Sequence, residues 1–284
     1  MGLGVMGTPM ALNIARKYPL TVWNRTSAKY PLLVQAGAHV ADTPRALLEK
    51  TDVVFTMLFN ENAFQSILSP EFKEGLCGKT LINTSSVSVD FSQYLASQIH
   101  EAGGHFIEMP VSGSKVPAEL GQLIGMLAGN PDVVEKIKPV VEPITKEAVY
   151  CGEIGMGLKT KYAVNLYLIT MTAGMAESMA LARAQGLDLT AFGQILDAGP
   201  MASAYSKLKF AKMINEDWSA QAAITDCYNL TQLIDSASNA VQAKSPLIHL
   251  CGLLYKEAIE QGFGGDDMIA VEKVLRNNKN KSRK

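Results

Sequence analysis

The pattern of apolar and polar residues changes character near residue 159. Before this point, short apolar runs alternate with amphipathic stretches, which is typical of strands and helices that alternate in an α/β domain. We expect strands at 20–23, 52–58, 80–86, 105–108, 123–129 and 148–150, and helices at 8–15, 27–36, 61–68, 91–102 and 131–144, with another that Thr43 caps and that has Pro44 at its first position. From Lys159 onward only helical periodicity remains, over 159–185, 189–197, 202–214, 225–240, 246–261 and 266–275. The pattern predicts a doubly wound, mostly parallel α/β domain over residues 1–154 and an all-α domain over 155–284.

A glycine motif of the form G-x-G-x-x-G stands at the start of the sequence. In dinucleotide-binding units the first glycine makes the strand-to-helix turn, the second lets the backbone approach the pyrophosphate, and the third packs helix on strand. The motif alone is a weak signal, but an expected helix and then a strand follow it, as a βαβ unit requires. The candidate cofactor residues here are Gly2, Leu3, Gly4, Val5, Met6 and Gly7.

The strand that should precede this motif is almost absent, because the sequence begins at Met1. Either the start is truncated, or the central parallel strand is unusually short. In both cases we expect a truncated first strand and a weakened centre of the sheet, because a strand of one or two residues adds few ladder hydrogen bonds.

Three polar residues, Asn24, Arg25 and Thr26, follow the strand at 20–23. An acidic residue at this place would suit the free ribose 2′-hydroxyl of NAD, whereas a guanidinium beside a hydroxyl suits the extra phosphate of NADP. We therefore expect NADP rather than NAD, the alternative being that Arg25 is only a solvent-facing side chain.

Further candidate residues follow the expected strands at 52–58 and 80–86. In doubly wound sheets ligands bind at the carboxyl edge, which makes Leu58, Phe59 and Ser86 candidates for contact with the cofactor. Serines at strand ends are also common turn and cap residues. The glycine motif favours the ligand interpretation.

The segment 109–115 is expected to be a loop with exposed backbone donors. Its small residues Ser112, Gly113 and Ser114 leave N–H groups accessible, which makes a suitable nest for a substrate carboxylate. Lys115 could attract the same carboxylate, but a lysine in a loop is more often simply exposed to solvent.

Lys161 and Asn165 stand four residues apart at the start of the helical part. On a helix they project from the same face, one turn apart. An ammonium and a carboxamide in this arrangement can hold and protonate a carbonyl oxygen. Gly155 and Gly157 precede them and are expected to form a tight turn, while Lys159 is interpreted as a surface residue.

Composition narrows the range of functions. The formal net charge is −1 with both signs nearly balanced, which argues against binding to nucleic acid or to an anionic membrane. The four cysteines and four histidines form no metal-binding pattern, so we expect no metal. The apolar segment 162–182 is interrupted by polar residues and is interpreted as a buried helix. We find no targeting signal and expect a cytoplasmic protein, or a mitochondrial one if the start is truncated; the basic end, 276–284, is expected to be a solvated tail.

Together these motifs resemble the β-hydroxyacid dehydrogenase family, which includes relatives of 6-phosphogluconate dehydrogenase, over nearly the whole chain. The likeness rests on Gly2-x-Gly4-x-x-Gly7, Asn83-Thr84-Ser85-Ser86, Pro110-Val111-Ser112-Gly113 and Gly155-x-Gly157-x-x-x-Lys161-x-x-x-Asn165, in this order. Segments 22–26 and 110–123 look most like the glyoxylate and succinic semialdehyde reductases. The 3-hydroxyisobutyrate dehydrogenases are the nearest cousins.

The resemblance implies a Rossmann domain, a long interdomain helix and an all-α domain that forms a homodimer or homotetramer. It also implies an oxidoreductase that uses NADP(H) or NAD(H) on a short semialdehyde acid or glyoxylate. By match, Lys161 would be the catalytic general acid and base, with Asn165 orienting the substrate. Ser112 and Gly113 would hold the substrate carboxylate, and Ser86 would contact the cofactor.

Three departures from the family pattern keep alternatives open. The first strand is truncated, Asn83 stands where the family usually has aspartate, and a later Lys-Asp-Leu motif should fall near 228–230, where no lysine occurs. One alternative is a weakened or non-catalytic oligomeric binding protein. Others are an NAD-dependent dehydrogenase of the 3-hydroxyisobutyrate type and an imine reductase, although the lysine at 161 argues against the last.

Overall fold

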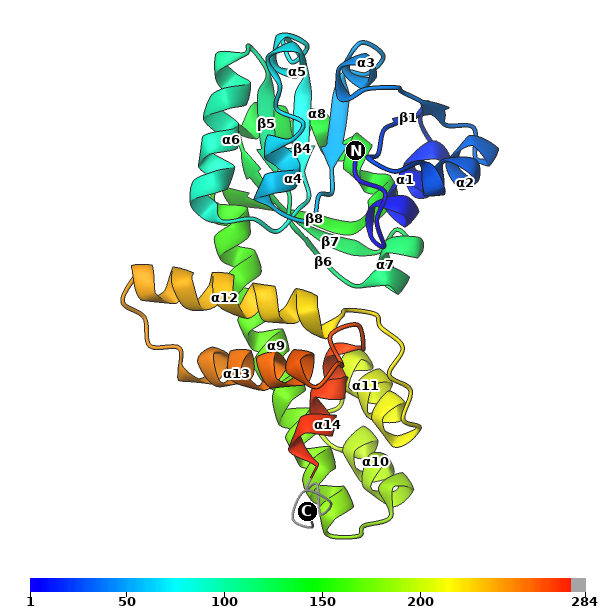
Figure 1. The fold of residues 1–284 in the computed structure, drawn as a ribbon, viewed down its shortest axis with the longest axis vertical. Helices are drawn as coiled ribbons and strands as arrows, with labels where there is room; N and C mark the ends of the chain where they lie inside the picture. The colour runs from blue at the N-terminus through cyan, green and yellow to red at the C-terminus, as the bar shows by residue number, and fades with distance from the viewer. Residues whose placement is uncertain (277–284) are drawn as a thin grey trace. The chain divides into compact units, whose positions relative to one another are not determined.

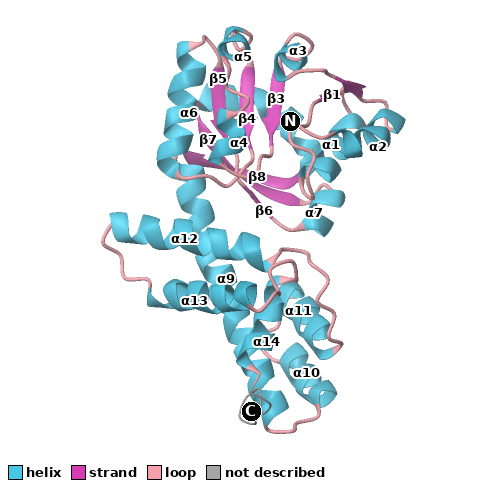
Figure 2. Cartoon of the chain, viewed as in Figure 1, coloured by secondary structure: helices cyan, strands magenta, loops and turns pink. Residues whose placement is uncertain are grey.

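The computed structural model describes residues 1–276, and these residues fold into two compact units divided between Lys161 and Tyr162. The first unit contains all the named strands, while the second contains only helices (Figures 1 and 2). The expected order, an α/β part followed by a helical part, is confirmed.

The main sheet of the first unit has six strands. Three of them, β3 (Val53–Thr56), β4 (Thr80–Asn83) and β5 (His105–Glu108), run parallel to one another. The next strand, β7 (Leu123–Gly129), pairs antiparallel with β5 and with β6 (Val111–Ser112), and parallel with β8 (Thr145–Gly152). The sheet is therefore mostly parallel, as expected. The segment expected to be only a loop contains β6, because Val111 and Ser112 find ladder partners in β7.

A second, smaller sheet is made of β1 (Thr21–Val22) and β2 (His39–Val40). The hydrophobic core of the first unit is also divided between the two sheets. One buried cluster, which includes Ile82, Ile107 and Leu127, lies around the main sheet, and a smaller one, which includes Leu33, lies around the small sheet. No strand of the described residues lies between β1 and β3, so the expected weak point of the sheet is present as a gap.

The helices of the first unit lie between the strands along the chain. They are α1 (Gly7–Ala15), α2 (Tyr30–Gln35), α3 (Pro44–Leu48), α4 (Glu61–Gln65), α5 (Pro70–Glu74), α6 (Val89–Glu101), α7 (Lys115–Glu119) and α8 (Pro131–Val141). Side-chain caps explain several starts: Thr43, Asn60 and Ser88 each accept a hydrogen bond from a backbone N–H in the first turn. Two short helices, α5 and α7, were not expected, because five residues carry too little periodicity to be recognised.

The second unit is built from helices only. A long helix, α9 (Met156–Ala184), begins in the first unit and continues into the second. It is followed by α10 (Leu189–Ala198), α11 (Ala204–Ile214), α12 (Ile224–Ala240), α13 (Pro246–Glu260) and α14 (Glu272–Leu275). The buried Lys209 donates to both oxygens of the buried Asp267, at 2.7 and 2.9 Å, and joins α11 to the segment before α14. Most of the tail expected to be solvated, 277–284, lies outside the described residues.

Candidate functional site

The glycine loop at the start of the chain has the backbone geometry that its motif predicts. Gly2 has a φ of +87°, and a Cβ there would lie 2.2 Å from the carbonyl oxygen of Met57. A Cβ on Gly7 would lie 1.9 Å from the carbonyl oxygen of Gly2, whereas a Cβ on Gly4 would meet no atom within 4 Å. The first and third glycines therefore allow close packing of the backbone. The second faces open space, as expected of a position that a ligand approaches.

Helix α1 begins directly behind this loop and has a free amino end. Met6, at the N-cap position, makes no side-chain cap hydrogen bond, and no acidic residue stands in the first turn. Val5, just before it, is 66% exposed. An uncapped helix start with accessible N–H groups is suited to a phosphate, so this part of the chain fits the pyrophosphate of a dinucleotide.

Asn24 ties the glycine loop to the end of β1. Its Oδ1 accepts from the N–H of Leu3 at 2.9 Å, and its Nδ2 donates to the carbonyl oxygen of Thr26, also at 2.9 Å. Asn24 therefore holds the loop in place. Arg25 is exposed and makes no ion pair within residues 1–276, which leaves its guanidinium available to a ligand.

The carboxyl ends of β3 and β4 are also linked. The N–H of Leu58 donates to Ser85 Oγ at 2.8 Å, while Phe59 is 70% exposed and Ser86 is half-buried. Asn83 is fully buried: its Oδ1 accepts from the N–H of Ser85 at 2.9 Å, and its Nδ2 has no partner among the described residues. The sequence pointed to Ser86, but Ser85 is the residue that joins the two strand ends.

Lys161 lies beside β6. Only 8% of it is exposed, and its Nζ donates to the carbonyl oxygen of Val111 at 2.6 Å. This hydrogen bond brings the amine next to the loop that contains Ser112, Gly113 and Ser114. In contrast, Lys159 is exposed. The structure therefore separates the two lysines as the sequence analysis expected.

Glu108, at the end of β5, was missed by the sequence analysis. Its side chain is fully buried and accepts three hydrogen bonds: from Ser92 Oγ at 2.5 Å, from the N–H of Gly155 at 3.1 Å and from the N–H of Leu158 at 2.7 Å. Burial raises the pKa of this carboxyl above its ordinary value, although these hydrogen bonds act in the opposite direction. The signal in the sequence was a carboxylate that ends an otherwise apolar strand.

Positions 155 and 157, just before Lys161, favour glycine because of the backbone conformation at one and the close contacts with the sheet and Glu108 at the other. A Cβ on Gly157 would lie 2.6 Å from the carbonyl oxygen of Met126 and 2.9 Å from Glu108 Oε1. Gly155 has a φ of +99°, which favours glycine. Both glycines therefore let the start of α9 approach Glu108 closely, and Lys161 follows on the same helix.

Three further positions from the sequence analysis lie outside the hydrogen bonds described above for Lys161 and Glu108. Lys115 is exposed and lies 3.7 Å from Glu119. Asn165 belongs to the second unit; it is buried, and its Nδ2 has no partner among residues 1–276. The segment 228–230, where a lysine was expected from the family pattern, lies within α12.

Two classes of site have no counterpart in the part of the chain that the structure describes. These residues contain no group of three or more side chains that could hold a metal ion. None of their helices is long and apolar enough to cross a membrane.

The glycine loop, the free start of α1 and the strand order define a dinucleotide-binding α/β domain followed by a helical domain. Two family models match: the NAD-binding domain of 6-phosphogluconate dehydrogenase over residues 1–152, and the NAD-binding domain of NADP-dependent 3-hydroxyisobutyrate dehydrogenase over residues 155–275.

Comparisons with individual proteins agree with these models. The chain is 32% identical to the chloroplastic glyoxylate/succinic semialdehyde reductase 2 of Arabidopsis thaliana, over 97% of this chain and 78% of that one. It is 31% identical to the reductase 1 of the same plant, over 97% of both. A 3-hydroxyisobutyrate dehydrogenase from Salmonella typhimurium has a similar fold, with a TM-score of 0.87 and 21% identity over 96% of this chain and 97% of that one. So does Psf3 in complex with NADP+ and 2-OPP, with a TM-score of 0.88 and 23% identity over 96% of this chain and 98% of that one.

The chain therefore belongs to the β-hydroxyacid dehydrogenase family of NAD(P)-dependent oxidoreductases. The resemblance seen in the sequence, and the fold that it implied, are both confirmed.

Proposed function

We propose that the protein is an NADP(H)-dependent oxidoreductase that interconverts glyoxylate or a short semialdehyde acid with the corresponding hydroxy acid, with Lys161 as general acid and base. The observation that carries this proposal is the buried position of Lys161, whose Nζ lies 2.6 Å from the carbonyl oxygen of Val111, one residue before Ser112. An amine beside a loop rich in backbone donors provides both a proton and a place for a carboxylate. The names of the two Arabidopsis relatives support this substrate class.

The chain's own residues suit the cofactor. The free start of α1 and the open space at Gly4 would take the pyrophosphate, and the exposed Arg25 would pair with the 2′-phosphate of NADP. Leu58, Phe59 and Ser86, at the carboxyl ends of β3 and β4, would lie along the rest of the cofactor. The family model named for an NADP-dependent dehydrogenase supports the choice of NADP.

The roles of the remaining residues follow from the chemistry of an aldehyde. When bound, the reduced nicotinamide supplies a hydride to the carbonyl carbon. Lys161 Nζ stabilises the negative charge that grows on the carbonyl oxygen and donates the proton that this oxygen takes up. The backbone donors of Ser112, Gly113 and Ser114 hold the carboxylate at the other end of the substrate. Asn165, one helical turn after Lys161 on α9, orients the reacting carbonyl.

Two substrate assays test the proposal. The first is a panel of glyoxylate, succinic semialdehyde, methylmalonate semialdehyde and tartronate semialdehyde, each with NADPH and NADH. The second compares Lys161→Ala with the matched control Lys159→Ala, which removes an exposed lysine from the same helix. We expect turnover to fall by about 10² to 10⁴ in the first variant only, with NADPH binding nearly unchanged. Equal turnover in both variants would contradict the role of Lys161.

A second candidate is a weakened or non-catalytic binding protein. The separation of the small sheet β1-β2 from the main sheet, among the described residues, favours it. Titration with NADPH by fluorescence separates the candidates, because absence of binding at millimolar cofactor would favour the second. Preference for NADH with methylmalonate semialdehyde, the oxidised partner of 3-hydroxyisobutyrate, would instead indicate a dehydrogenase of that type.

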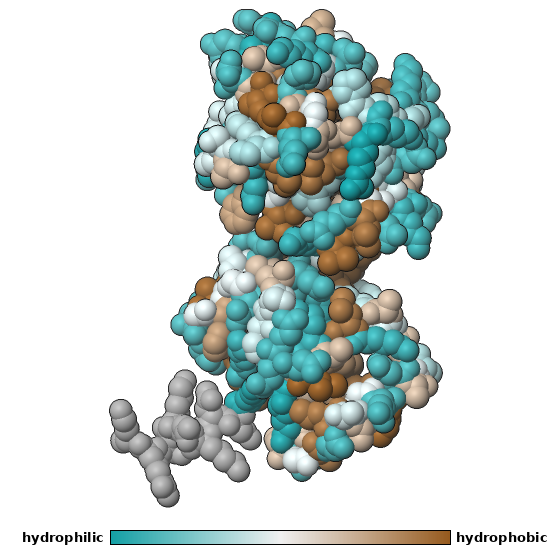
Figure 3. Space-filling view, turned by 90° about the vertical axis from the view of Figure 1, so that its right-hand side faces the viewer, coloured by the Kyte–Doolittle hydropathy of each residue, from teal (hydrophilic) through white to brown (hydrophobic). Residues whose placement is uncertain are grey.

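The helical unit is proposed to form the contacts of a homodimer or homotetramer. It exposes large apolar side chains, among them Tyr167, Ile195 and Met201, which are 68%, 72% and 77% exposed. Figure 3 shows patches of apolar side chains on its surface. Such patches are common where proteins meet one another. Light scattering in solution would give the oligomeric state.

A further inference from the structure

A buried asparagine joins the helix behind the glycine loop to the helix behind the loop 112–114. Asn13, in the second half of α1, is only 5% exposed. Its Nδ2 donates to the carbonyl oxygen of Ala118 at 2.8 Å and to that of Glu119 at 3.3 Å. Both oxygens belong to α7, which lies beside α1 (Figure 1). The side chain therefore connects two helices that are far apart in the sequence.

The two acceptors lie at the end of a helix that is weak by itself. Carbonyl oxygens in the last turn of a helix have no partner within the helix, and a helix of a single turn is not stable alone. α7 has only five residues. The N–H of Gly121 donates to the carbonyl oxygen of Ala118 at a long distance, 3.4 Å. Asn13 is thus a cap for α7 that comes from another part of the chain.

The surroundings of Asn13 fix the orientation of its amide. The exposed Arg16 donates from Nη1 to Asn13 Oδ1 at 2.9 Å. Because a guanidinium can only donate, Oδ1 must face Arg16, and Nδ2 must face the two carbonyl oxygens. Met10 and Ile14 of α1 belong to the same buried apolar cluster as Ala118. The amide therefore makes a directed polar connection within an otherwise apolar contact between the helices.

α7 in turn holds the loop that precedes it. Ser114 is the N-cap residue of α7, and its carbonyl oxygen accepts from the N–H of Ala118 at 3.1 Å. Gly113 has a φ of +129°, and a Cβ there would lie 2.7 Å from Leu123 Cδ2 and 3.1 Å from Pro117 Cβ. The loop is packed this closely against α7, so a displacement of α7 would displace the loop as well.

We propose that Asn13 is a positioning residue for substrate binding, which fixes α7 against α1 and thereby holds the backbone donors of residues 112–114 where they take the substrate carboxylate. This inference rests on the proposed function of that loop. The start of α1 is the proposed place of the cofactor pyrophosphate, so one helix connects the supports of both ligands. The carboxylate does not react, and its binding contributes equally before and in the transition state. Loss of the positioning should therefore raise the KM for the substrate and leave kcat nearly unchanged.

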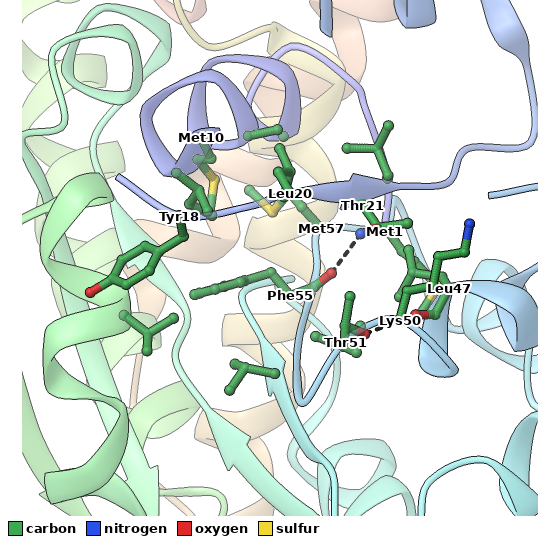
Figure 4. Close-up of a pocket in the computed structure, with 18 of the residues that line it drawn as sticks. Met1, Met10, Tyr18, Leu20, Thr21, Leu47, Lys50, Thr51, Phe55 and Met57 are labelled. Atoms are coloured by element: carbon green, nitrogen blue, oxygen red, sulfur yellow. Dashed lines mark hydrogen bonds between the residues drawn. The ribbon is translucent and has the colours of Figure 1, made fainter. Parts of the chain in front are cut away.

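Tyr18, just beyond α1, makes a comparable connection that does not involve α7. Its hydroxyl donates to the carbonyl oxygen of Pro139, in α8, at 2.8 Å. Its ring lies at the edge of a mostly apolar cavity of about 300 Å³, which Met10 and Leu20 also line (Figure 4). Tyr18→Phe removes one hydrogen bond from the same end of α1 and leaves the contact with α7 unchanged. It is the matched control for Asn13.

The kinetic test uses NADPH and the panel substrate that the natural protein reduces fastest. Asn13→Asp keeps the shape of the side chain and the acceptor for Arg16, but its carboxylate has no donor for the two carbonyl oxygens. We expect Asn13→Asp and Asn13→Ala to raise the KM for the substrate about tenfold. In both variants kcat and the dissociation constant for NADPH should change less than about twofold. Tyr18→Phe should leave all three quantities unchanged.

A second measurement does not depend on turnover. Hydrogen exchange at the amides of Ala118 and Leu120, whose hydrogen bonds hold α7, should become about tenfold faster in the Asn13 variants, because the helix opens more often. The amide of Val134, which donates within α8, is the internal control and should not change. Arg16→Ala, which removes the donor that orients the amide, should show the same effects at about a third of the size.

The outcomes separate this inference from the proposed function. A natural protein that reduces no member of the panel would refute the proposed function. An active natural protein with a normal KM in Asn13→Asp, or unchanged exchange of the α7 amides in that variant, would overturn only the role of Asn13. Should Asn13→Asp not fold, Arg16→Ala decides, since its side chain is exposed, and a normal KM with unchanged exchange in it would equally overturn the inference.

Discussion

Glu108 provides the sharpest test of how the fold positions the proposed catalytic lysine. Its carboxylate holds the first turn of α9 through Gly155 and Leu158, and the helix in turn carries Lys161. Two substitutions separate charge from shape: Glu108→Gln keeps the volume and one acceptor oxygen, whereas Glu108→Ala removes every acceptor. We expect both variants to be less stable, and the alanine variant to be the less stable of the two.

The magnitude follows from the hydrogen bonds that are lost. The alanine variant leaves two backbone N–H groups and the Ser92 hydroxyl without their acceptor in a buried place. Each unsatisfied buried donor costs about 1–3 kcal/mol, partly offset because a buried charge is also removed. We therefore expect a loss of about 3–5 kcal/mol in the free energy of unfolding. The glutamine variant, which turns an amide N–H₂ toward one of the donors, should lose about 1–3 kcal/mol.

Catalysis should respond more strongly than cofactor binding. A shift of about 1 Å at Lys161 is enough to lower turnover by about 10². The glycine loop does not touch Glu108, so the dissociation constant for NADPH should change less than about twofold. Denaturant unfolding, steady-state kinetics and a fluorescence titration on Glu108→Gln measure the three quantities. Loss of NADPH binding with unchanged turnover per bound cofactor would refute the reasoning.

The same substitution gives a pH dependence with a definite sign. Burial raises the pKa of Glu108 above its ordinary value of 4.5. The folded state therefore holds this proton more tightly than the unfolded state, and the resulting stabilisation is complete below about pH 4.5 and is lost as the pH rises through the folded pKa. Because glutamine does not titrate, the stability advantage of the natural protein over Glu108→Gln should shrink as the pH rises above 4.5. An advantage that grows with pH would show that the shift has the opposite direction.

Four further substitutions test other parts of the structure. Gly7→Ala should prevent folding, because its Cβ would lie 1.9 Å from a carbonyl oxygen, whereas Gly4→Ala should fold normally and weaken NADPH binding; circular dichroism and a cofactor titration distinguish the two outcomes. Arg25→Ala should raise the KM for NADPH about tenfold, or about 1.4 kcal/mol, and change that for NADH little; an equal effect on both would exclude a contact with the 2′-phosphate. Lys209→Met should lower the free energy of unfolding by about 3–5 kcal/mol, because it leaves the carboxylate of Asp267 buried without its cation, and a loss below 1 kcal/mol in denaturant would contradict this.

Local sequence signals predicted the elements that carry strong patterns. The strands β5 and β7 were predicted to the residue, because each contains a short group of apolar residues that polar residues or glycine delimit. The pair His39–Val40 gives no such signal, since a two-residue strand has no measurable period. β8 is longer than expected, because half of its residues are exposed and the strand is held by its ladder to β7 rather than by an apolar pattern.

The candidate site also has one part that the sequence predicted and one part that it did not. The glycine loop could be predicted because all its residues are adjacent in sequence, and the steric reasons for Gly2 and Gly7 appear in the structure as expected. The role of Glu108 could not be predicted, because the backbone groups that it binds, Gly155 and Leu158, are 47 and 50 residues away in the sequence. A carboxylate near the end of a strand has many possible roles, and only the tertiary fold shows that it caps the start of a distant helix.

The proposed cofactor and catalytic parts of the site depend on different supports. The glycine loop is held by Asn24 and by the backbone hydrogen bonds of Met1 and Gly2, whereas Lys161 is held through the hydrogen bonds of Glu108. Neither support touches the other. Asn24→Ala should therefore change NADPH affinity with little effect on turnover at saturating cofactor, while Glu108→Gln should do the reverse. Combining the two changes should give additive effects on the free energies of binding and activation, because sites without shared contacts rarely couple by more than about 0.5 kcal/mol.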